Sequence, residues 1–275
     1  MSEASLLTSA PVGACPGLSV CVLACDEEAE LARCLDALAW ADEIVVVVDA
    51  KSRDGSEKVA RERAARVEVR TYAGDIEQKR GCSELARNDW VLIVDPDEVV
   101  SEALGREIRG LLDGAGGQRG QGGPDGYEVN RATFHLGRWI RHGDFYPDWK
   151  LRLYRRSRAR WVGRDPHGRV VVEGAVGRLR EELAHYSYRD LADQIARIQF
   201  FSDQSARAMH RDGRRARVSD LVLRPPARFL RAYLLKRGFL DGTAGFIIAA
   251  ATAFHVFLKY AKLWERERGA GGTRG

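Results

Sequence analysis

Three continuous runs of Val, Ile and Leu constrain the fold more than any other feature. They are LSVCVLA at 18–24, EIVVVVDA at 43–50 and WVLIVD at 90–95. A strand without alternating apolar and polar residues is covered by other structure on both faces. Such strands are typical of parallel sheets, so the first part of the chain is expected to fold as an α/β unit.

The segments between these strands have the spacing of helices. Leu31, Leu35 and Leu38, for example, recur at helical intervals. The expected helices are 27–41, 56–65, 76–87 and 101–112, and an additional strand is expected at 66–73. Strands that alternate with helices predict right-handed βαβ units and a mainly parallel sheet.

The rest of the chain differs in character. A Gly-rich stretch at 113–126 predicts a loop. The extended segments expected after it are 126–137, 150–157 and 169–174, and the expected helices are 188–210 and 224–242. These extended segments predict an antiparallel extension of the sheet, followed by a helical C-terminal region.

The C-terminal region is both basic and apolar. Between Arg207 and Arg237 there are ten Lys and Arg residues but two acids, a composition that suits phosphate on lipid headgroups or nucleic acid. The apolar segment 243–258 has 16 residues, whereas a membrane-spanning helix needs about 20. It is interpreted as a helix in a membrane interface, with a core or dimer helix and a true span as alternatives.

The cysteines and the N-terminus bear on localisation. The five cysteines are odd in number and lack the spacing of metal ligands, which indicates a reducing compartment without a disulfide framework. Residues 1–17 have no basic region and no proper apolar region of a signal peptide. The chain is therefore expected to be cytoplasmic, or attached to a membrane from the cytoplasmic side.

Carboxylates follow three of the predicted strands. CDEE (25–28) follows the first, DAKSRDGS (49–56) ends the second, and DPDE (95–98) ends the run at 90–95. The carboxyl ends of parallel strands meet at one edge of a sheet, where unpaired carboxylates repel one another. A divalent cation on Asp97, with Asp95 nearby, would relieve the repulsion, and oxygen ligands suit Mg²⁺ or Mn²⁺. The alternative is a solvated turn.

Phosphate-binding glycine loops are missing from the sequence. There is no G-x-x-x-x-G-K-[ST] segment and no G-x-G-x-x-G after the first strand. A bound phosphate would therefore be neutralised by a metal instead of by glycine amides.

Several motifs resemble the family 2 glycosyltransferases with the GT-A fold. They are LSVCVLACDEEAELARCLDAL, VVVVDAKSRDGS and QKRGCSELARNDWVLIVDPDEVVS, within residues 17–112. Later segments, HGDFYPDWKLRLYRRSRARW, PHGRV, LAHYSYRDL and FLKYAKLWE, resemble the bacterial lipopolysaccharide-core β-glucosyltransferase branch. The resemblance implies a metal-dependent, inverting enzyme. It would move a sugar, with glucose the best guess, from a UDP-sugar to a hydroxyl of a membrane-associated glycan such as a lipopolysaccharide core.

The resemblance also implies a domain organisation. Its parts are a flexible N-terminus (1–16), a Rossmann-like nucleotide-sugar half (17–112), an acceptor-side half (113–187) and a membrane-associating helical region (188–275). The partners implied are the UDP-sugar, the lipid-linked glycan and a membrane surface, without nucleic acid.

Site residues follow from the same resemblance. Asp49 would accept from the uracil N–H, Glu27 would lie against the ribose or base, and Asp95 would contact the ribose or the sugar. Ser52 and Asp54 would shape the turn beside the nucleotide, and Lys79 would approach the phosphates or the aspartates. Asp97 would hold the metal ion, joined by His185.

This chain departs from the family pattern at three places. Asp26 stands where Asn is usual, Pro96 replaces the frequent Ala of the D-x-D motif, and Gly168 replaces a carboxylate that relatives often carry after the histidine of PHGRV. The base that deprotonates the acceptor is therefore open among Asp165, Asp148 and His167. Two other functions stay open: a non-catalytic or repurposed nucleotide-sugar-binding protein, and a nucleotidyltransferase, although the latter is expected to carry a Gly/Arg-rich loop after the first strand.

Overall fold

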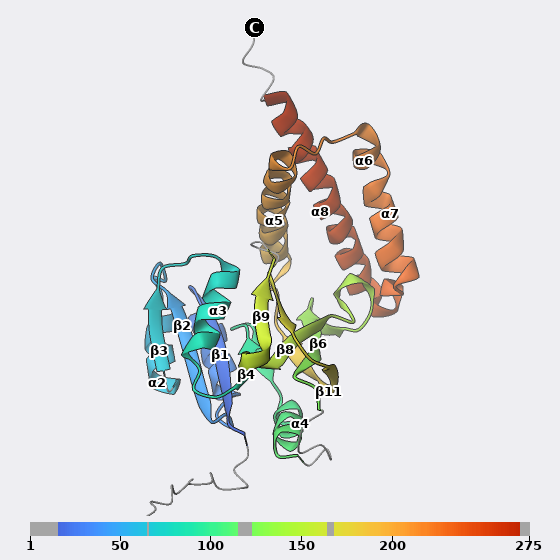
Figure 1. Cartoon of the computed structure of the whole chain (residues 1–275). Coiled ribbons are helices and arrows are strands. Elements are labelled where there is room, and N and C mark those ends of the chain that lie inside the picture. Colours follow the sequence, from blue (N-terminus) through green and yellow to red (C-terminus); the bar gives the residue numbers. More distant parts are fainter. Residues whose placement is uncertain (1–15, 65, 115–122, 164–167, 270–275) are drawn as a thin grey trace, which may run out of the picture. The chain divides into compact units, whose positions relative to one another are not determined.

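The computed structural model describes residues 16–269 except 65, 115–122 and 164–167 (Figure 1). The expected N-terminal segment 1–16 thus lies almost wholly outside the described residues, as does much of the Gly-rich loop. The chain forms two compact units that are interleaved in sequence. Unit 1 contains 1–96, 100–128 and 151–181, and unit 2 contains 97–99, 129–150 and 182–275.

Unit 1 is built on four parallel strands. These are β1 (Leu18–Ala24), β2 (Glu43–Asp49), β3 (Arg66–Arg70) and β4 (Trp90–Val94), in the order β3-β2-β1-β4 (Figure 1). Every neighbouring pair is parallel, which confirms the prediction made from the continuous apolar runs.

Four helices accompany these strands: α1 (Glu28–Asp36), α2 (Ser56–Arg63), α3 (Asp75–Leu85) and α4 (Glu102–Leu112). All four were expected. The first ends five residues earlier than predicted because residues 37–40 form turns, in which Leu38 is still fully buried. Helix α4 begins with a cap: the Ser101 hydroxyl accepts a hydrogen bond from the Leu104 N–H at 3.1 Å.

The core lies on both faces of the parallel strands. On one face, Val45, Val47 and Ile93 pack with Cys82 of α3 and with Tyr154. The alternate residues of the same strands, such as Val46 and Val94, point to the other face and are fully buried as well. Burial on both faces explains why the strands are continuously apolar.

An antiparallel extension completes the sheet. The sheet order is β3-β2-β1-β4-β8-β6-β11-β5, and β7 pairs with β6. The additional strands are β5 (Glu98–Val100), β6 (Gly126–His135), β7 (Arg138–Ile140), β8 (Trp149–Arg155) and β11 (Val176–His185), and a separate hairpin is formed by β9 (Ala159–Val162) and β10 (Arg169–Val172). Strands β6, β8 and β10 were expected; β5, β7, β9 and β11 were not.

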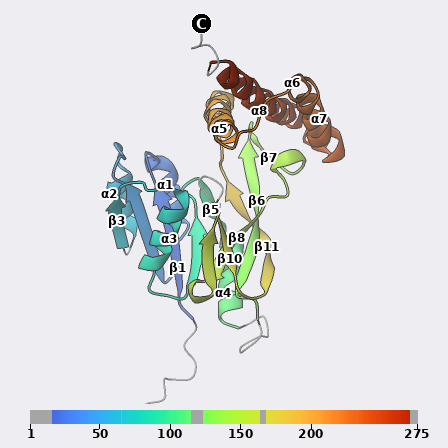
Figure 2. The same cartoon turned by 45° about the horizontal axis from the view of Figure 1, so that its top comes forward.

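Helices make up the C-terminal part of unit 2. They are α5 (Leu191–Arg211), α6 (Val218–Val222), α7 (Arg224–Leu230), the π-helical turn η3 (Arg231–Leu235), the 3₁₀ turn η4 (Gly238–Asp241) and α8 (Gly242–Gly269). Helices α5 and α8 lie side by side in Figures 1 and 2, and Met209 of α5 is buried with Tyr260 and Leu263 of α8.

Helix α8 is much longer than the apolar segment predicted at 243–258. By length and composition, Gly238–Arg268 could cross a membrane, and a third of its most apolar window is buried inside the protein. Ile248 and Leu263 are fully buried, whereas Phe254 and Phe257 are exposed. The helix therefore packs on unit 2 with one side and leaves aromatic residues on another.

Candidate active site

The DPDE segment lies between two strands. Strand β4 ends at Val94, Asp95 and Pro96 follow, and β5 begins at Glu98. Asp95 belongs to unit 1 and Asp97 to unit 2, so the surroundings of each are described separately.

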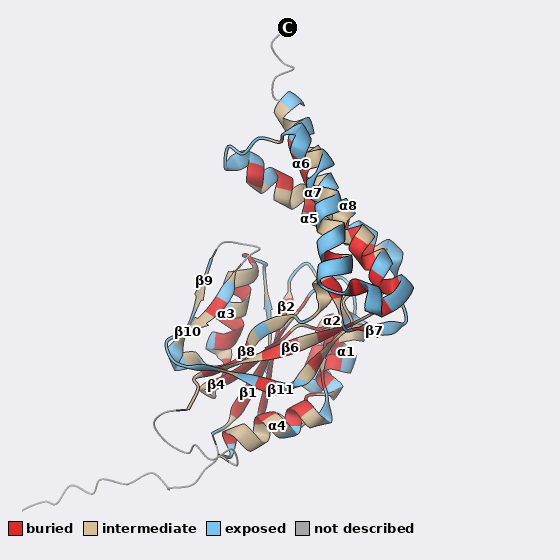
Figure 3. Cartoon of the chain, turned by 90° about the vertical axis from the view of Figure 1, so that its right-hand side faces the viewer, coloured by how far each residue is buried: buried red, intermediate tan, exposed pale blue. Residues whose placement is uncertain are grey.

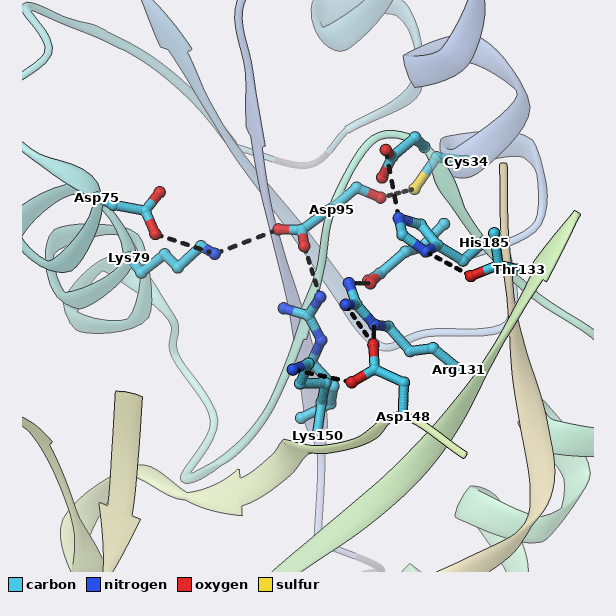
Figure 4. A network of polar contacts seen from close by, with 12 residues as sticks. Cys34, Asp75, Lys79, Asp95, Arg131, Thr133, Asp148, Lys150 and His185 are labelled. Carbon is cyan, nitrogen blue, oxygen red and sulfur yellow. Dashed lines mark hydrogen bonds and ion pairs between the residues drawn. The ribbon is translucent and has the colours of Figure 1, made fainter. Parts of the chain in front are cut away.

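Asp95 is paired with two cations of unit 1. Its carboxylate lies 2.5 Å from the Arg152 guanidinium and 3.4 Å from Lys79 Nζ, which in turn lies 3.5 Å from Asp75 (Figure 4). Arg152 comes from β8 and its side chain is 9% exposed, while Lys79 comes from α3. Lys79 thus lies beside Asp95, and the sequence did not predict Arg152.

Asp97 faces a histidine of unit 2. Its Oδ2 lies 3.5 Å from His185 Nε2, and both side chains are largely buried. The other ring nitrogen, Nδ1, lies 3.4 Å from the Thr133 hydroxyl (Figure 4). The Tyr186 N–H donates to the Asp97 carbonyl at 2.8 Å, which fixes the backbone beside the pair.

The Asp97–His185 pair suits a metal ion bound partly by substrate. Among the described residues, no group of three or more His, Cys, Asp or Glu side chains is arranged as a metal cluster. Mg²⁺ is commonly held by one or two protein ligands together with phosphate oxygens and water. If Nδ1 donates its hydrogen to Thr133, the Nε2 lone pair is free for a metal, and such outer hydrogen bonds orient ligating histidines. A carboxylate and an imidazole side by side therefore fit such an ion.

Asp148, a candidate base, is held by cations of unit 2. Its carboxylate lies 2.5 Å from the Arg131 guanidinium and 2.9 Å from Lys150 Nζ, and Arg131 also pairs with the fully buried Glu98 (Figure 4). Burial alone would raise the pKa of Asp148, but the charges and hydrogen bonds of Arg131 and Lys150 outweigh it and lower the pKa. A carboxylate stabilised in this way is a weak base.

The other two candidate bases, Asp165 and His167, lie outside the described residues. Gly168 directly after them is described. A Cβ placed on Gly168 would lie 2.0 Å from Cγ1 of Ile76, so a carboxylate-bearing side chain there requires Ile76 to move. This close approach gives a physical reason for glycine at a position where relatives often carry an acid.

The loops after β1 and β2 are tied together by hydrogen bonds. Asp26, in a left-handed conformation with φ 55°, accepts from the Arg53 N–H at 2.6 Å. Asp54 accepts from the Glu28 N–H at 2.8 Å and from the Ser52 hydroxyl at 3.1 Å. Burial raises the pKa of Asp54, but these hydrogen bonds and those from Ser56 lower it overall. Ser52 and Asp54 thus shape this turn.

Two more residues, predicted to bind the nucleotide of the sugar donor, lie beside these loops. Glu27 immediately precedes α1, and its carboxylate accepts from the Cys25 N–H at 3.3 Å. Asp49 ends β2 and accepts from the Lys51 N–H at 3.0 Å. Asp49 and Glu27 are both partly exposed.

The sequence analysis predicted neither Arg152 nor Arg131, and for Arg152 there is a physical reason. Arg152 stands in KLRLYRR, which suggests a strand with a single basic face. In the structure Arg152 is buried, and its neighbours Lys150 and Arg155 are paired with Asp148 and Asp125. The signal that could have found Arg152 is its position between Leu151 and Leu153.

The described cysteines, Cys21, Cys25, Cys34 and Cys82, are all free.

Comparisons of the sequence with known proteins identify the family. The model of glycosyl transferase family 2 matches residues 19–178. The lipopolysaccharide core biosynthesis glycosyltransferase LpsC of Rhizobium meliloti is 30% identical over 90% of this chain and 92% of its own. A protein of Rickettsia felis described as an uncharacterised glycosyltransferase is 28% identical over 90% of this chain and 89% of its own.

A solved structure supports the fold. The mannosyltransferase PcManGT of Pyrobaculum calidifontis, solved with GDP-Man and Mn²⁺, superposes with a TM-score of 0.50 at 17% identity, covering 94% of this chain and 92% of that one. The expected GT-A architecture, with its mainly parallel sheet and a helical C-terminal region, is thereby confirmed. The chain is an enzyme of the glycosyltransferase class and belongs to glycosyl transferase family 2.

Proposed function

We propose that this protein is a metal-dependent, inverting glycosyltransferase that moves a sugar from a UDP-sugar to a hydroxyl of a membrane-associated glycan, such as a lipopolysaccharide core. Glucose is the sugar proposed. The observation that carries the proposal is the pairing of Asp97 with His185, two residues after an Asp95 that is balanced by Lys79 and Arg152.

The donor is assigned to the loops after the parallel strands. In this proposal Asp49 accepts from the uracil N–H and Glu27 lies against the ribose or base. Asp95 accepts from the ribose or sugar hydroxyls, with its carboxylate held by Lys79 and Arg152. Lys79, which contacts Asp95, is assigned to the phosphates.

Asp97 and His185 would hold Mg²⁺ or Mn²⁺. Bound to the diphosphate, the ion would offset the negative charge that develops on the leaving UDP. The protein's own contribution is to present the carboxylate and the imidazole together, with the ring oriented by Thr133.

The transfer requires a base on the acceptor side. The acceptor oxygen bonds to the sugar carbon as the bond from that carbon to UDP breaks, and the acceptor proton passes to the base. Asp165, Asp148 and His167 remain the proposed candidates. The lowered pKa of Asp148 ranks it below Asp165 and suits it better to positioning Arg131.

The acceptor is proposed to be bound at the cytoplasmic face of the inner membrane. The similarity to LpsC supports a lipopolysaccharide-type acceptor, and the apolar stretch Gly238–Arg268 is compatible with membrane association. We propose peripheral or monotopic attachment through the region 188–275.

Calorimetric titration with UDP-glucose, with and without Mn²⁺, tests the proposal. The wild type is expected to bind tightly only with the metal, and Asp97→Ala is expected to bind equally weakly with and without it. Asp36→Ala, which removes a carboxylate exposed on α1, serves as the control and should behave like the wild type. Equal binding by wild type and Asp97→Ala would refute the metal assignment, and a screen of other UDP-sugars tests the choice of glucose.

A second candidate is a nucleotide-sugar-binding protein without transferase activity. It is favoured by Gly168 and by the ion pairs that weaken Asp148 as a base. Release of UDP from a UDP-sugar in the presence of Mn²⁺ distinguishes the two: turnover supports the enzyme, and tight binding without turnover supports the binding protein.

A further inference from the structure

The corner between helices α7 and α8 exposes a set of large apolar side chains. We name it the corner patch: Leu230, Leu234, Leu235, Phe239 and Leu240, whose exposed fractions are 49%, 51%, 80%, 44% and 51%. Figure 3 shows exposed stretches along α6 and α7 in pale blue. Soluble surfaces rarely gather this many large apolar side chains within eleven consecutive residues.

The corner is well packed on its inner side, so its outer side is exposed by the fold itself. Ala232 is fully buried, and Tyr233 stacks against Phe229 and meets Phe239 and Phe246 edge-on. Leu230, Leu234 and Leu235, which flank Ala232 and Tyr233 in the chain, are all exposed.

The charges around the patch are of one sign. Residues 224–240 contain five Arg and Lys residues and no acid. Arg228 and Lys236 pair with Asp144, whereas Arg231 and Arg237 are exposed and form no ion pair with an acid in the described part of the chain. Apolar side chains beside unpaired guanidinium groups complement a surface that is apolar beneath and anionic above, as a bilayer with acidic lipids is.

Charge along the chain agrees with that partner. Residues 188–275 contain 17 Lys and Arg residues against 8 Asp and Glu residues, a net charge of +9. Residues 1–187 contain 27 Lys and Arg residues against 31 Asp and Glu residues, a net charge of −4. Attraction to an anionic surface therefore comes from the helical region that carries the patch.

We infer that the corner patch inserts into the headgroup region of an anionic lipid bilayer, with Arg231 and Arg237 at the level of the phosphates. This inference rests on the proposed function, since it specifies how the enzyme reaches a membrane-associated acceptor. It assigns the insertion to 230–240 in place of the segment 243–258, because Ile248, Ala249 and Ala251 of that segment are already buried in the protein.

Salt bridges and hydrogen bonds connect the corner to residues 141–144, which precede Asp148 in the chain. Asp144 lies 2.9 Å from the Arg228 guanidinium and 3.0 Å from Lys236 Nζ, and its side chain is 4% exposed. The Gly143 N–H donates to the Lys236 carbonyl at 2.9 Å. The buried Asp241 accepts from the Arg141 and His142 N–H groups at 3.0 and 2.8 Å. Insertion at 230–240 therefore sets the depth of residues 141–144 relative to the membrane.

Vesicle co-sedimentation of the full-length chain tests the inference. Vesicles of phosphatidylcholine with 30% phosphatidylglycerol are the probe, with pure phosphatidylcholine vesicles for comparison. The wild type is expected to bind the anionic vesicles at least tenfold more strongly, and Leu234→Ser/Leu235→Ser is expected to lose at least tenfold of that binding. The matched control is Phe200→Ser/Phe201→Ser, which removes two exposed aromatic side chains of α5 and should bind like the wild type.

Hydrogen exchange on vesicles locates the contact without mutation. Protection is expected at 230–240 and not at the exposed residues of α8 near Phe254. Protection confined to α8, resistance to alkaline carbonate extraction, or a lipid-free dimer that the Leu234→Ser/Leu235→Ser variant dissolves would each overturn the inference. UDP-glucose binding, measured in the same preparations without lipid, separates the two proposals: a wild type that binds UDP-glucose but not the anionic vesicles contradicts the corner patch alone.

Discussion

Two aspartates separated by one proline have different electrostatic partners. Asp95 is held by two cations, whereas Asp97 faces a single histidine. A carboxylate already balanced by Lys79 and Arg152 suits hydrogen bonding to hydroxyl groups, and one beside an imidazole suits a metal ion. The two carboxylates of this turn therefore have different electrostatic surroundings.

Replacing Arg152 tests how strongly Asp95 depends on its partner. Arg152→Leu is expected to lower the free energy of unfolding by about 1–3 kcal/mol, because a partly buried carboxylate loses its closest cation. Chemical denaturation measures the loss. Arg155→Leu on the same strand, where the side chain is 44% exposed, should cost less than about 1 kcal/mol. Equal losses for the two variants would show that Asp95 does not need Arg152.

Asp148 gives a prediction about pH. Its pKa in the folded protein lies below the ordinary value, so ionised Asp148 stabilises the fold above that value and loses the effect as pH falls through the folded pKa. Asp148→Asn is expected to cost about 1–3 kcal/mol at pH 7 and at pH 5. The cost should shrink below about pH 4, where Asp148 of the unfolded chain takes up a proton, and should be lost below the folded pKa.

Denaturation curves at pH 7, 5 and 3.5 provide that measurement. Asp36→Asn, at an exposed ion pair with Arg63, should change stability by less than about 1 kcal/mol at each pH. A cost for Asp148→Asn that is the same at pH 3.5 as at pH 7 would contradict the role given to Arg131 and Lys150.

At the scale of elements, α8 has two kinds of apolar residue. Leu263 is fully buried against Ala206 and Met209 of α5, whereas Phe254 and Phe257 are exposed. The first kind holds the helices of unit 2 together, and the second is available to lipid or to solvent.

The same substitution at two leucines should separate these roles. Leu263→Ala is expected to cost about 2–5 kcal/mol in lipid-free buffer, because it leaves a cavity between α5 and α8. Leu235→Ala, at an 80% exposed position, should change lipid-free stability by less than about 0.5 kcal/mol. Thermal unfolding measures the stability of both variants. A large loss of stability in Leu235→Ala would mean that the corner is packed against protein.

The elements that sequence could predict are those with a strong periodic pattern. The strands β1, β2 and β4 are continuous apolar runs because they are buried on both faces, and each was placed to within about a residue. Strand β11 was not predicted because its buried residues, Leu179 and Leu183, are four positions apart, which resembles a helix. Strands β5 and β7 have three residues each, too few for any periodicity.

The candidate site was predictable where its residues end strands. Asp49, Asp95 and Asp97 follow apolar runs, so their shared edge could be inferred from chain order. The pairing of Arg152 with Asp95 could not be inferred, because the two residues are 57 positions apart and the pairing depends on β8 running antiparallel to β4. His185 was expected from family resemblance alone, and its distance to Asp97 required the fold.

At the scale of the whole molecule, ligand binding is expected to raise the stability of the folded protein. UDP with Mn²⁺, each at about 100 times its Kd, is expected to raise the free energy of unfolding by about 2.7 kcal/mol and the melting temperature by roughly 5 °C. UDP or Mn²⁺ alone should give a smaller rise. Scanning fluorimetry measures the shift, and an Asp97→Ala variant that gains as much as the wild type would contradict the metal assignment.

The uneven charge along the chain has a practical consequence. The isoelectric point of about 9.0 is an average of a basic region at 188–275 and a mildly acidic region at 1–187, and it describes neither. On a cation-exchange column at neutral pH, the helical region alone would be drawn to the resin. Retention would thus report the state of that region, so proteolytic loss of the basic helices would show up as material that fails to bind the column, before any assay of activity is made.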